Sequence, residues 1–264
     1  MPARSAGSHG KSAAPKSAER PAPAAKSTKR PAAKSTAAAK STAAAAKALR
    51  RPLRGPKRVA GAIAHLRASD PALAEIIERV GPDGLGSPRS GRPPDHYGAL
   101  LRAIVGQQLS TKAAASIFGR LTARFDDRTP TPAEVLADDP EELRAAAGLS
   151  RAKVGFLRSL AEHVISGELE LELLDDLPDE QVIEELVAVK GLGIWTAHMF
   201  LMFHLERPDV LPVGDLGVRR AIERAYGLDG LPDPVTMERI AEPWQPYRSL
   251  ACRYLWRSLD NEPG

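Results

Sequence analysis

From about Val59 to the C-terminus, apolar side chains recur at intervals of three and four residues, the spacing that places them on one face of an α-helix. Within residues 151–166, for example, the apolar positions are Val154, Leu157, Leu160, Ala161 and Val164. No stretch alternates apolar and polar residues for long, as a half-buried strand would. The pattern therefore predicts an all-α fold of roughly ten short helices in two lobes.

Local signals mark where several of these helices begin. Asp70-Pro71 and Asp139-Pro140 each place a capping carboxylate before a proline that suits the first helical turn. Further helices are predicted at residues 96–108, 111–125, 151–166, 179–189, 194–205, 216–225, 234–242 and 246–259. We interpret residues 59–264 as one folded domain.

Residues 1–58 differ in composition and are predicted to be a disordered, basic tail. They consist almost entirely of Ala, Lys, Pro, Ser, Arg and Thr, which cannot bury a core. They hold 15 Lys and Arg against one acid, which gives a charge of +14. Because the whole chain has a net charge of +4, residues 59–264 carry a net charge of −10. The composition resembles the tails of linker histones, which favours attraction to DNA phosphates. A solubilising tail, or one that binds any polyanion, is the alternative.

The cysteine count and the hydropathy of the chain limit its surroundings. Cys252 is the single cysteine, so no disulfide, cysteine-based zinc site or iron–sulfur cluster can form within the chain. The N-terminus lacks an apolar signal segment, and no apolar run approaches the length of a membrane span. We therefore expect a soluble protein of a reducing compartment, cytoplasmic and, in a bacterium, associated with the nucleoid.

The segment VKGLGIWTA, residues 189–197, places two glycines directly before an apolar helix. Gly191 can supply the positive φ with which the preceding helix would end, and Gly193 lets the chain reverse and another backbone approach closely. The next helix then exposes the N–H groups of its first turn at the positive end of its dipole, where a phosphate would bind. An ordinary glycine turn between two helices explains the pattern equally well.

Four segments, in this order along the chain, resemble those of one family of DNA repair enzymes. AIVGQQLSTKAAASIFGRL (residues 103–121) resembles the Gln-Gln segment of 3-methyladenine DNA glycosylases, and GLGIWTA (191–197) a helix–hairpin–helix motif. The Gly/Pro-rich loop that ends at Asp215 resembles the loop of the helix–hairpin–helix-GPD superfamily, and EPWQPYRSLACRYLW (242–256) a C-terminal motif of the same glycosylases. The resemblance spans about residues 58–260.

The resemblance implies an enzyme that flips an alkylated purine, of the 3-methyladenine or 7-methylguanine type, out of duplex DNA and hydrolyses its N-glycosidic bond. Asp215 would be the carboxylate that stabilises positive charge on the sugar. The sequence alone also allows Asp215 to be a simple N-cap of the next helix. The alternative function is a non-catalytic DNA-binding protein, in which hairpin and tail grip the backbone.

The residue at position 195 bears on the reaction. In relatives that also cleave the strand, the residue two positions after the second hairpin glycine is a lysine, which attacks the sugar. Trp195 stands there in this chain, so a monofunctional glycosylase without AP-lyase activity is expected. Trp195 and Trp256 would offer aromatic faces to a cationic base, with core packing as the alternative for both. Met199 and Leu216 occupy two further pocket positions that are aromatic in the bacterial inducible members.

The resemblance also implies two DNA-contacting loops. A wedge loop would fill the gap left by the flipped base, with its second and third residues at the tip; it consists of Gln107, Gln108, Leu109 and Ser110. The alternative is a turn between helices, capped by its serine. The hairpin would contact the backbone through Gly191, Gly193, Ile194 and Thr196.

No cofactor is required for such a reaction, but the resemblance implies Na⁺ or K⁺ on the hairpin. Its ligands would be the carbonyls of Val187, Val189 and Leu192. The histidines show no metal-ligand spacing, and His198 is interpreted as a buried or groove-lining residue. The expected partner is double-stranded DNA that contains alkylated bases, bound by a monomer away from membranes. Hypoxanthine, ethenoadenine and 1-methyladenine stay open as substrates.

Overall fold

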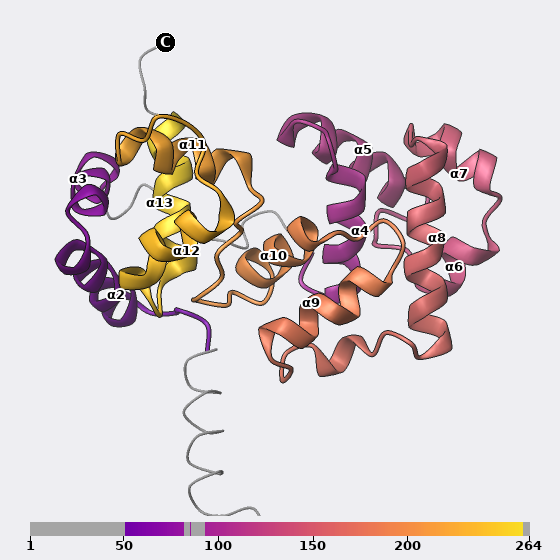
Figure 1. The fold of residues 1–264 in the computed structure, drawn as a ribbon. Coiled ribbons are helices and arrows are strands. Elements are labelled where there is room, and N and C mark those ends of the chain that lie inside the picture. Colours follow the sequence, from indigo (N-terminus) through magenta and orange to yellow (C-terminus); the bar gives the residue numbers. More distant parts are fainter. Residues whose placement is uncertain (1–50, 82–84, 86–92, 261–264) are drawn as a thin grey trace, which may run out of the picture.

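The computed structural model describes residues 51–81, 85 and 93–260; within them it contains twelve α-helices, two short 3-10 helices and no strand (Figure 1). The all-α prediction is confirmed. The α-helices are α2 (Pro56–Ser69), α3 (Pro71–Val80), α4 (His96–Gly106), α5 (Thr111–Ala123), α6 (Pro132–Ala137), α7 (Pro140–Ala147), α8 (Arg151–Ser166), α9 (Asp179–Ala188), α10 (Ile194–Phe203), α11 (Leu216–Ala225), α12 (Pro234–Ala241) and α13 (Arg248–Asp260). The 3-10 helices are η1 (Leu171–Leu173) and η2 (Glu242–Trp244).

Most helix ends lie where the sequence predicts them. Asp70 and Asp139 cap α3 and α7, each with a proline in the first turn, and α8 and α11 have the predicted bounds. α4 ends at Gly106, two residues early, which leaves the next two residues in a turn. The sequence pattern misses α6, because six residues are too few to show a period; its signal is the capping box of Thr131 and Glu134.

The N-terminal boundary of the domain differs from the prediction. α2 begins at Pro56, inside the segment predicted to be a tail, and Ala62 and Leu66 from this helix are buried in the core. Proline suits the first helical turn, so the basic composition of residues 51–58 conceals a helix start. The rest of the predicted tail, residues 1–50, lies outside the described residues.

The helices form two lobes, as predicted, with α10 between them (Figure 1). α4 to α8 pack on one another in one lobe, and α2, α3, η2 and α11 to α13 pack in the other. The first and last described helices therefore belong to the same lobe. α10 contacts α9 and α4 on one side, and its Phe203 stacks on Trp256 of α13 on the other, so this helix joins the lobes.

Asp70 ties the first helices of that lobe to the last ones. Its Oδ1 accepts the backbone N–H groups of Ala72 and Leu73, at 2.9 and 3.1 Å. Its Oδ2 accepts the indole N–H of Trp244 at 2.8 Å and the hydroxyl of Tyr226. Four donors compensate for burying this carboxylate, which fixes α3 against α11 and η2.

The loop between α10 and α11 is fixed by buried polar contacts. The guanidinium of Arg207 donates to three backbone carbonyls in residues 174–177, at 2.9 to 3.1 Å. The hydroxyl of Ser249 donates to the carbonyl of Arg207 at 2.7 Å and accepts the N–H of Val210 at 2.9 Å. These contacts hold the stretch of chain that leads to Asp215.

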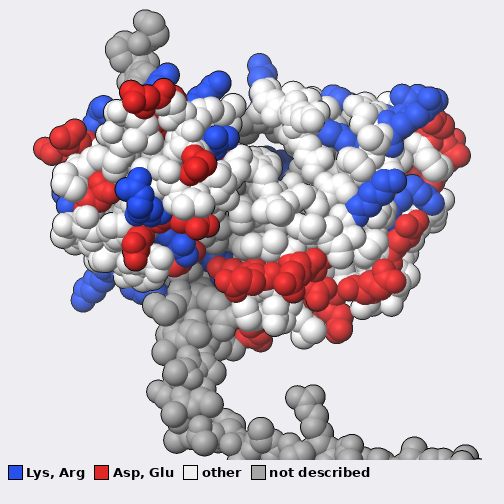
Figure 2. Space-filling model, viewed as in Figure 1, with Lys and Arg blue, Asp and Glu red and all other residues white. Residues whose placement is uncertain are grey.

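Charge is unevenly distributed over the described surface. Figure 2 shows acidic side chains gathered in a band across α9 and the segment before it. Residues 168–185 hold nine Asp and Glu and no Lys or Arg. Such a band repels phosphates, so this edge is unsuited to DNA. In the described part of the chain, every helix is too short or too polar to cross a membrane.

Candidate active site

The hairpin between α9 and α10 has the positive φ predicted at Gly191, but the close approach of another backbone predicted at Gly193 is not found within the described residues. α9 ends at Ala188, and Gly191 has a φ of 96°, in the left-handed region. A Cβ at Gly191 would overlap the ring of Phe156, so a side chain is excluded there. At Gly193 a Cβ would meet nothing within 4 Å, so no other part of the described chain approaches it closely. That exposed position is free to meet a ligand.

Gly193 is also the N-cap of α10, and no side chain caps this helix. The N–H groups of the first turn consequently point out of the helix without a capping oxygen, at the positive end of its dipole. Ile194 is the first residue of that turn and is 58% exposed, although it is apolar. Thr196, in the same turn, is buried.

Asp215 lies at the start of α11, opposite the first turn of α10. Its Oδ1 accepts the backbone N–H of Val218 at 2.8 Å and the indole N–H of Trp256 at 2.7 Å. Its Oδ2 accepts the indole N–H of Trp195 at 2.7 Å. Asp215 is 8% exposed. It is therefore both the N-cap of α11 and a buried anion held by two tryptophans.

Gly217 makes this arrangement possible. A Cβ at this position would lie 2.8 Å from Cδ1 and 2.9 Å from Nε1 of Trp256, and 3.1 Å from Oδ1 of Asp215. Any larger residue would therefore push the Trp256 indole away from the carboxylate. Gly217 is not among the site residues predicted from the sequence, although its place in a helix two residues after Asp215 is an available signal.

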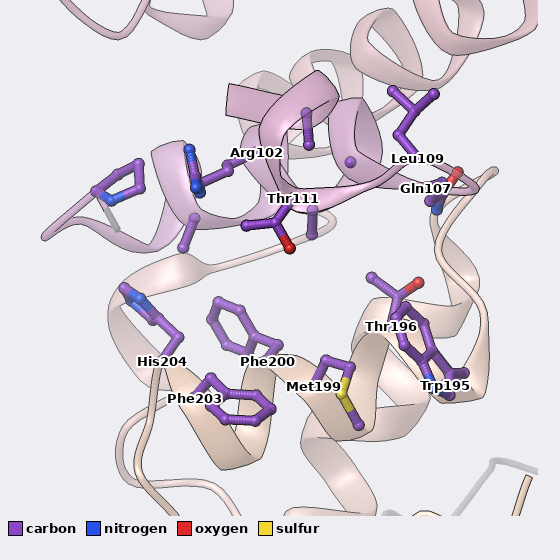
Figure 3. A pocket seen from close by; sticks show the side chains of 15 residues that line it. Arg102, Gln107, Leu109, Thr111, Trp195, Thr196, Met199, Phe200, Phe203 and His204 are labelled. Carbon is purple, nitrogen blue, oxygen red and sulfur yellow. The ribbon is translucent and has the colours of Figure 1, made fainter. Parts of the chain in front are cut away.

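A pocket of about 260 Å³ lies between α10 on one side and α4 with the start of α5 on the other (Figure 3). α10 and the residue after it contribute a largely aromatic wall, namely Trp195, Thr196, Met199, Phe200, Phe203 and His204. The labelled residues of the facing wall are Arg102, Gln107, Leu109 and Thr111. None of the lining residues is acidic.

Two of the four predicted pocket residues line this cavity. Trp195 and Met199 do so, whereas Trp256 and Leu216 are not among the lining residues. Trp256 stacks on Phe203, with ring centroids 5.8 Å apart, and thus supports the aromatic wall from behind. Leu216 is 47% exposed, next to Asp215. Phe203 is not among the pocket residues predicted from the sequence, and its signal is the apolar run after Trp195.

A pair of histidines closes one end of the pocket wall. His204 is buried, and its Nε2 lies 2.7 Å from Nδ1 of His96, the first residue of α4. The ring of His204 stacks on Phe200, with centroids 4.9 Å apart. His204 lies at the end of the cavity away from Trp195 (Figure 3), and its contact with His96 joins α10 to α4 there.

The predicted wedge loop connects α4 to α5 beside the pocket. Gln108 has a φ of 58° and is exposed, and Leu109 is 38% exposed although it is apolar. Ser110 caps α5 by accepting the N–H of Ala113 at 3.3 Å. Gln107 faces inward instead, because its amide Nε2 donates to the carbonyl of Gly191 at 2.7 Å. The structure thus brings the wedge loop against the hairpin.

The remaining titratable groups of the site do not form a metal centre. No group of three or more His, Cys, Asp or Glu within the described residues could hold a metal ion. His198, on α10, lines a second cavity on the side of Asp179 and Arg248, and burial lowers its pKa. Burial, with the nearby charge of Asp215, raises the pKa of the Cys252 thiol, which makes this cysteine unreactive.

Comparisons with known proteins agree with this geometry. The family model described as HhH-GPD superfamily base excision DNA repair protein matches residues 101–246. The chain is 35% identical, over 196 residues, to DNA-3-methyladenine glycosylase 1 of Schizosaccharomyces pombe. That match covers 74% of this chain and 85% of the relative.

Two solved structures have a similar fold. The S. pombe 3-methyladenine DNA glycosylase in complex with abasic DNA matches with a TM-score of 0.65 and 34% identity, over 74% of this chain and 95% of that one. The DNA-3-methyladenine glycosidase of Bacillus halodurans matches with a TM-score of 0.65 and 34% identity, over 80% of this chain and 92% of that one.

Proposed function

The chain belongs to the HhH-GPD superfamily of base excision DNA repair proteins, and we propose that it is a monofunctional DNA glycosylase that excises alkylated purines from duplex DNA. The substrate class is supported by similarity to proteins named for 3-methyladenine. The observation that carries the proposal is the environment of Asp215. Two indole N–H groups and a helix N-terminus hold one carboxylate in place, and Trp195, one of its partners, lines an aromatic pocket.

The aromatic pocket would receive the flipped base. 3-Methyladenine and 7-methylguanine carry delocalised positive charge when they are attached to the sugar, and electron-rich ring faces attract such cations. Phe200, Phe203 and Trp195 supply those rings. A base lodged there stands clear of the duplex stack, which exposes its glycosidic bond.

Asp215 would stabilise the sugar as that bond breaks. The electron pair of the C1′–N bond leaves with the cationic base, which departs as a neutral molecule, while positive charge builds on the sugar ring. A fixed carboxylate lowers the free energy of that charge without having to reorient. The oxygen of a water then bonds to C1′, and its proton passes to the carboxylate or to solvent. The products are the free base and an abasic site.

Two loops would hold the DNA during this reaction. The uncapped first turn of α10 would bind a phosphate of the damaged strand through its backbone N–H groups. Gln108 and Leu109 would enter the gap left by the flipped nucleotide, where an apolar side chain replaces lost stacking. Neither contact reads a base, which suits an enzyme that must act in any sequence.

We further propose that the hairpin binds a monovalent cation through its backbone carbonyls. Na⁺ and K⁺ bind neutral carbonyl oxygens, and the ligands would be the carbonyls of Val187, Val189 and Leu192. The carbonyl of Val189 accepts the N–H of Leu192 at 3.0 Å, which uses one of its two lone pairs. A bound cation would add positive charge beside the phosphate site.

We also propose that the protein acts as a monomer, in a cytoplasmic, reducing compartment.

Base release by two matched variants tests the proposal. Asp215→Asn keeps the size of the side chain but removes its charge, so we expect single-turnover release of 3-methyladenine and 7-methylguanine to fall by about 100-fold or more. Binding to DNA that contains an abasic analogue should persist. Asp233→Asn makes the same change at the N-cap of α12, where the side chain accepts the N–H of Thr236 at 2.7 Å, and should leave release unchanged.

The same assay distinguishes the enzyme from a non-catalytic DNA-binding protein. A wild-type protein that binds duplex DNA but releases no base from any alkylated duplex would support the non-catalytic alternative. Equal rates for the wild type and for Asp215→Asn would leave the glycosylase in place but remove the role given to this carboxylate.

A further inference from the structure

The wedge loop and the hairpin are joined by a direct hydrogen bond. The amide Nε2 of Gln107 donates to the carbonyl of Gly191 at 2.7 Å, and 84 positions separate the two residues in sequence. Gln107 is the first residue after α4, and Gly191 is the left-handed residue of the hairpin. The two loops proposed to contact DNA therefore cannot move independently while this bond is intact.

One lysine of α8 lies against the wedge end of this connection. The ammonium of Lys153 donates to the carbonyl of Val105 at 2.7 Å and to the carbonyl of Gln107 at 2.8 Å. These carbonyls belong to the C-terminal end of α4, where helical partners are missing and the negative end of the dipole favours a cation. Part of the lysine is buried, which lowers its pKa. Its ammonium thus binds carbonyls of the protein's own backbone.

A phenylalanine on the same face of α8 lies against the hairpin end. Phe156 follows Lys153 by three positions, so the two side chains are neighbours on the helix. The ring of Phe156 occupies the space that a Cβ at Gly191 would need, so ring and hairpin backbone are in direct contact. One face of α8 consequently supports both loops, the wedge through an ammonium and the hairpin through a ring.

We propose that Lys153 is a positioning residue that, through Gln107, holds the wedge loop and the hairpin at a fixed separation. The phosphate grip and the entry of the wedge into the duplex then occur as one coupled event. This inference rests on the proposed function for its DNA contacts. Fixed spacing matters because the wedge must meet the vacated gap while the hairpin holds the strand beside it, and small misplacements are costly.

A lysine near DNA loops invites another explanation, which is direct contact with a phosphate. The two explanations differ in their salt dependence. Loss of a phosphate-contacting lysine weakens the dependence of affinity on salt by roughly one ion, because one fewer counterion is released. Loss of a lysine that binds only protein carbonyls leaves that dependence unchanged.

The test compares full-length Lys153→Met, Gln107→Met and the double variant with the wild type. Methionine preserves most of the side-chain length but cannot donate a hydrogen bond. The duplex carries 2-aminopurine opposite a tetrahydrofuran abasic analogue. The fluorescence of the 2-aminopurine reports wedge entry without any bond being broken. Arg151→Met is the matched control, because this residue is on α8, 81% exposed and paired with Glu141.

We expect each single variant to slow wedge entry by about tenfold or more, and the double variant to be no slower than the slower single one. The salt dependence of DNA affinity should be the same in these variants as in the wild type. Arg151→Met should match the wild type in both wedge entry and salt dependence. A salt dependence reduced by one ion for Lys153→Met, additive effects, or unchanged wedge entry in folded variants would overturn the proposal. Wedge entry is measured without catalysis, so its result does not depend on whether the protein releases a base. A failure of the proposed function and a failure of this proposal can therefore be told apart.

Discussion

The indole Nε1 of Trp195 lies 2.7 Å from Oδ2 of Asp215, so the tryptophan donates a hydrogen bond to the carboxylate. Trp256 donates to the other oxygen at the same distance. Hydrogen bonds to an ionised acceptor are stronger than neutral ones, and two that bind different oxygens restrict the rotation of the carboxylate. Both tryptophans therefore act through their edges on Asp215, in addition to any role of their faces.

Trp195→Phe separates these two roles. Phenylalanine keeps an aromatic face toward the pocket but has no N–H to give to Asp215. Loss of a hydrogen bond to a charged group costs about 1.5 to 3 kcal/mol, so we expect single-turnover base release to fall by roughly ten- to a hundredfold. The measurement is release of 7-methylguanine at saturating protein.

Trp244→Phe is the matched control for that variant. The indole of Trp244 donates to Oδ2 of Asp70 at 2.8 Å, and neither residue lines the pocket. The substitution should lower the melting temperature but leave base release at saturation unchanged. If Trp195→Phe releases bases as fast as the wild type, the hydrogen bond has no part in the rate, and the ring face accounts for the role of Trp195.

Gly217→Ala reaches the same carboxylate from the other side. Because an alanine Cβ would lie 2.8 Å from the Trp256 ring, the indole must move away from Asp215. We expect base release to fall by about tenfold, since a hydrogen bond to a charged group is weakened. Gly214→Ala is the control, because a Cβ there meets nothing within 4 Å and should have no effect.

Stability makes this second pair of variants informative. Alanine favours a helix over glycine by up to about 1 kcal/mol, and Gly217 is in the first turn of α11. A slower enzyme of unchanged or higher melting temperature would show that the site itself was disturbed. An enzyme as active as the wild type would mean that the Trp256 bond is dispensable.

The sequence predicts the helices well because their signals are local. Caps such as Asp70 and the apolar spacing of residues 151–166 are both contained within a few turns of chain. The hairpin is predictable for the same reason, since one glycine must adopt a positive φ. The start of α2 is lost because the basic composition of the tail continues past Pro56 into the first helix.

The chemistry of the site depends on packing, which the sequence does not display. Trp195 and Trp256 are 20 and 41 positions from Asp215, and the pattern of either helix does not show that both indoles point at one carboxylate. Gly217 looks only like a weak helix former until the Trp256 ring is placed beside it. Lys153 looks like one more surface charge until its carbonyl partners are seen.

The hydrogen bond from Trp195 to Asp215 also predicts that the enzyme does not cleave the DNA strand. A lyase reaction needs an amine that forms a Schiff base with the sugar, and the indole nitrogen of Trp195 is aromatic and already donates to Asp215. Treatment with borohydride during reaction on abasic duplex DNA should therefore trap no covalent adduct from the folded domain. An adduct mapped to residues 51–260 would contradict this.

That experiment needs a protein without the basic tail. Residues 1–50 contain eleven Lys and Arg, and lysine amines outside the site can also react with an abasic sugar. We expect any adduct formed by the full chain to disappear when those residues are deleted. An adduct that survives the deletion, but not the change Lys190→Met, would identify the exposed hairpin lysine as the nucleophile.

The tail is predicted to raise DNA affinity without changing the chemistry. The deletion should end at residue 50, because the residues that follow belong to the folded domain. Arg54 pairs with Glu206 at 2.7 Å, and α2 begins at Pro56. Removal of eleven basic residues should weaken duplex binding and flatten the dependence of affinity on salt, since fewer counterions are released. Single-turnover base release at saturation should stay unchanged, because Asp215 and the pocket are unaltered.

A second variant separates charge from length in that experiment. Replacing the eleven basic residues of 1–50 with glutamine keeps the tail at full length but removes its positive charge. If counterion release explains the tail's effect, this variant should match the deletion in affinity and in salt dependence. An unchanged salt dependence in both variants would assign DNA binding to the folded domain alone. That domain carries an acidic band over α9, so its DNA contacts would then come from a surface other than this edge.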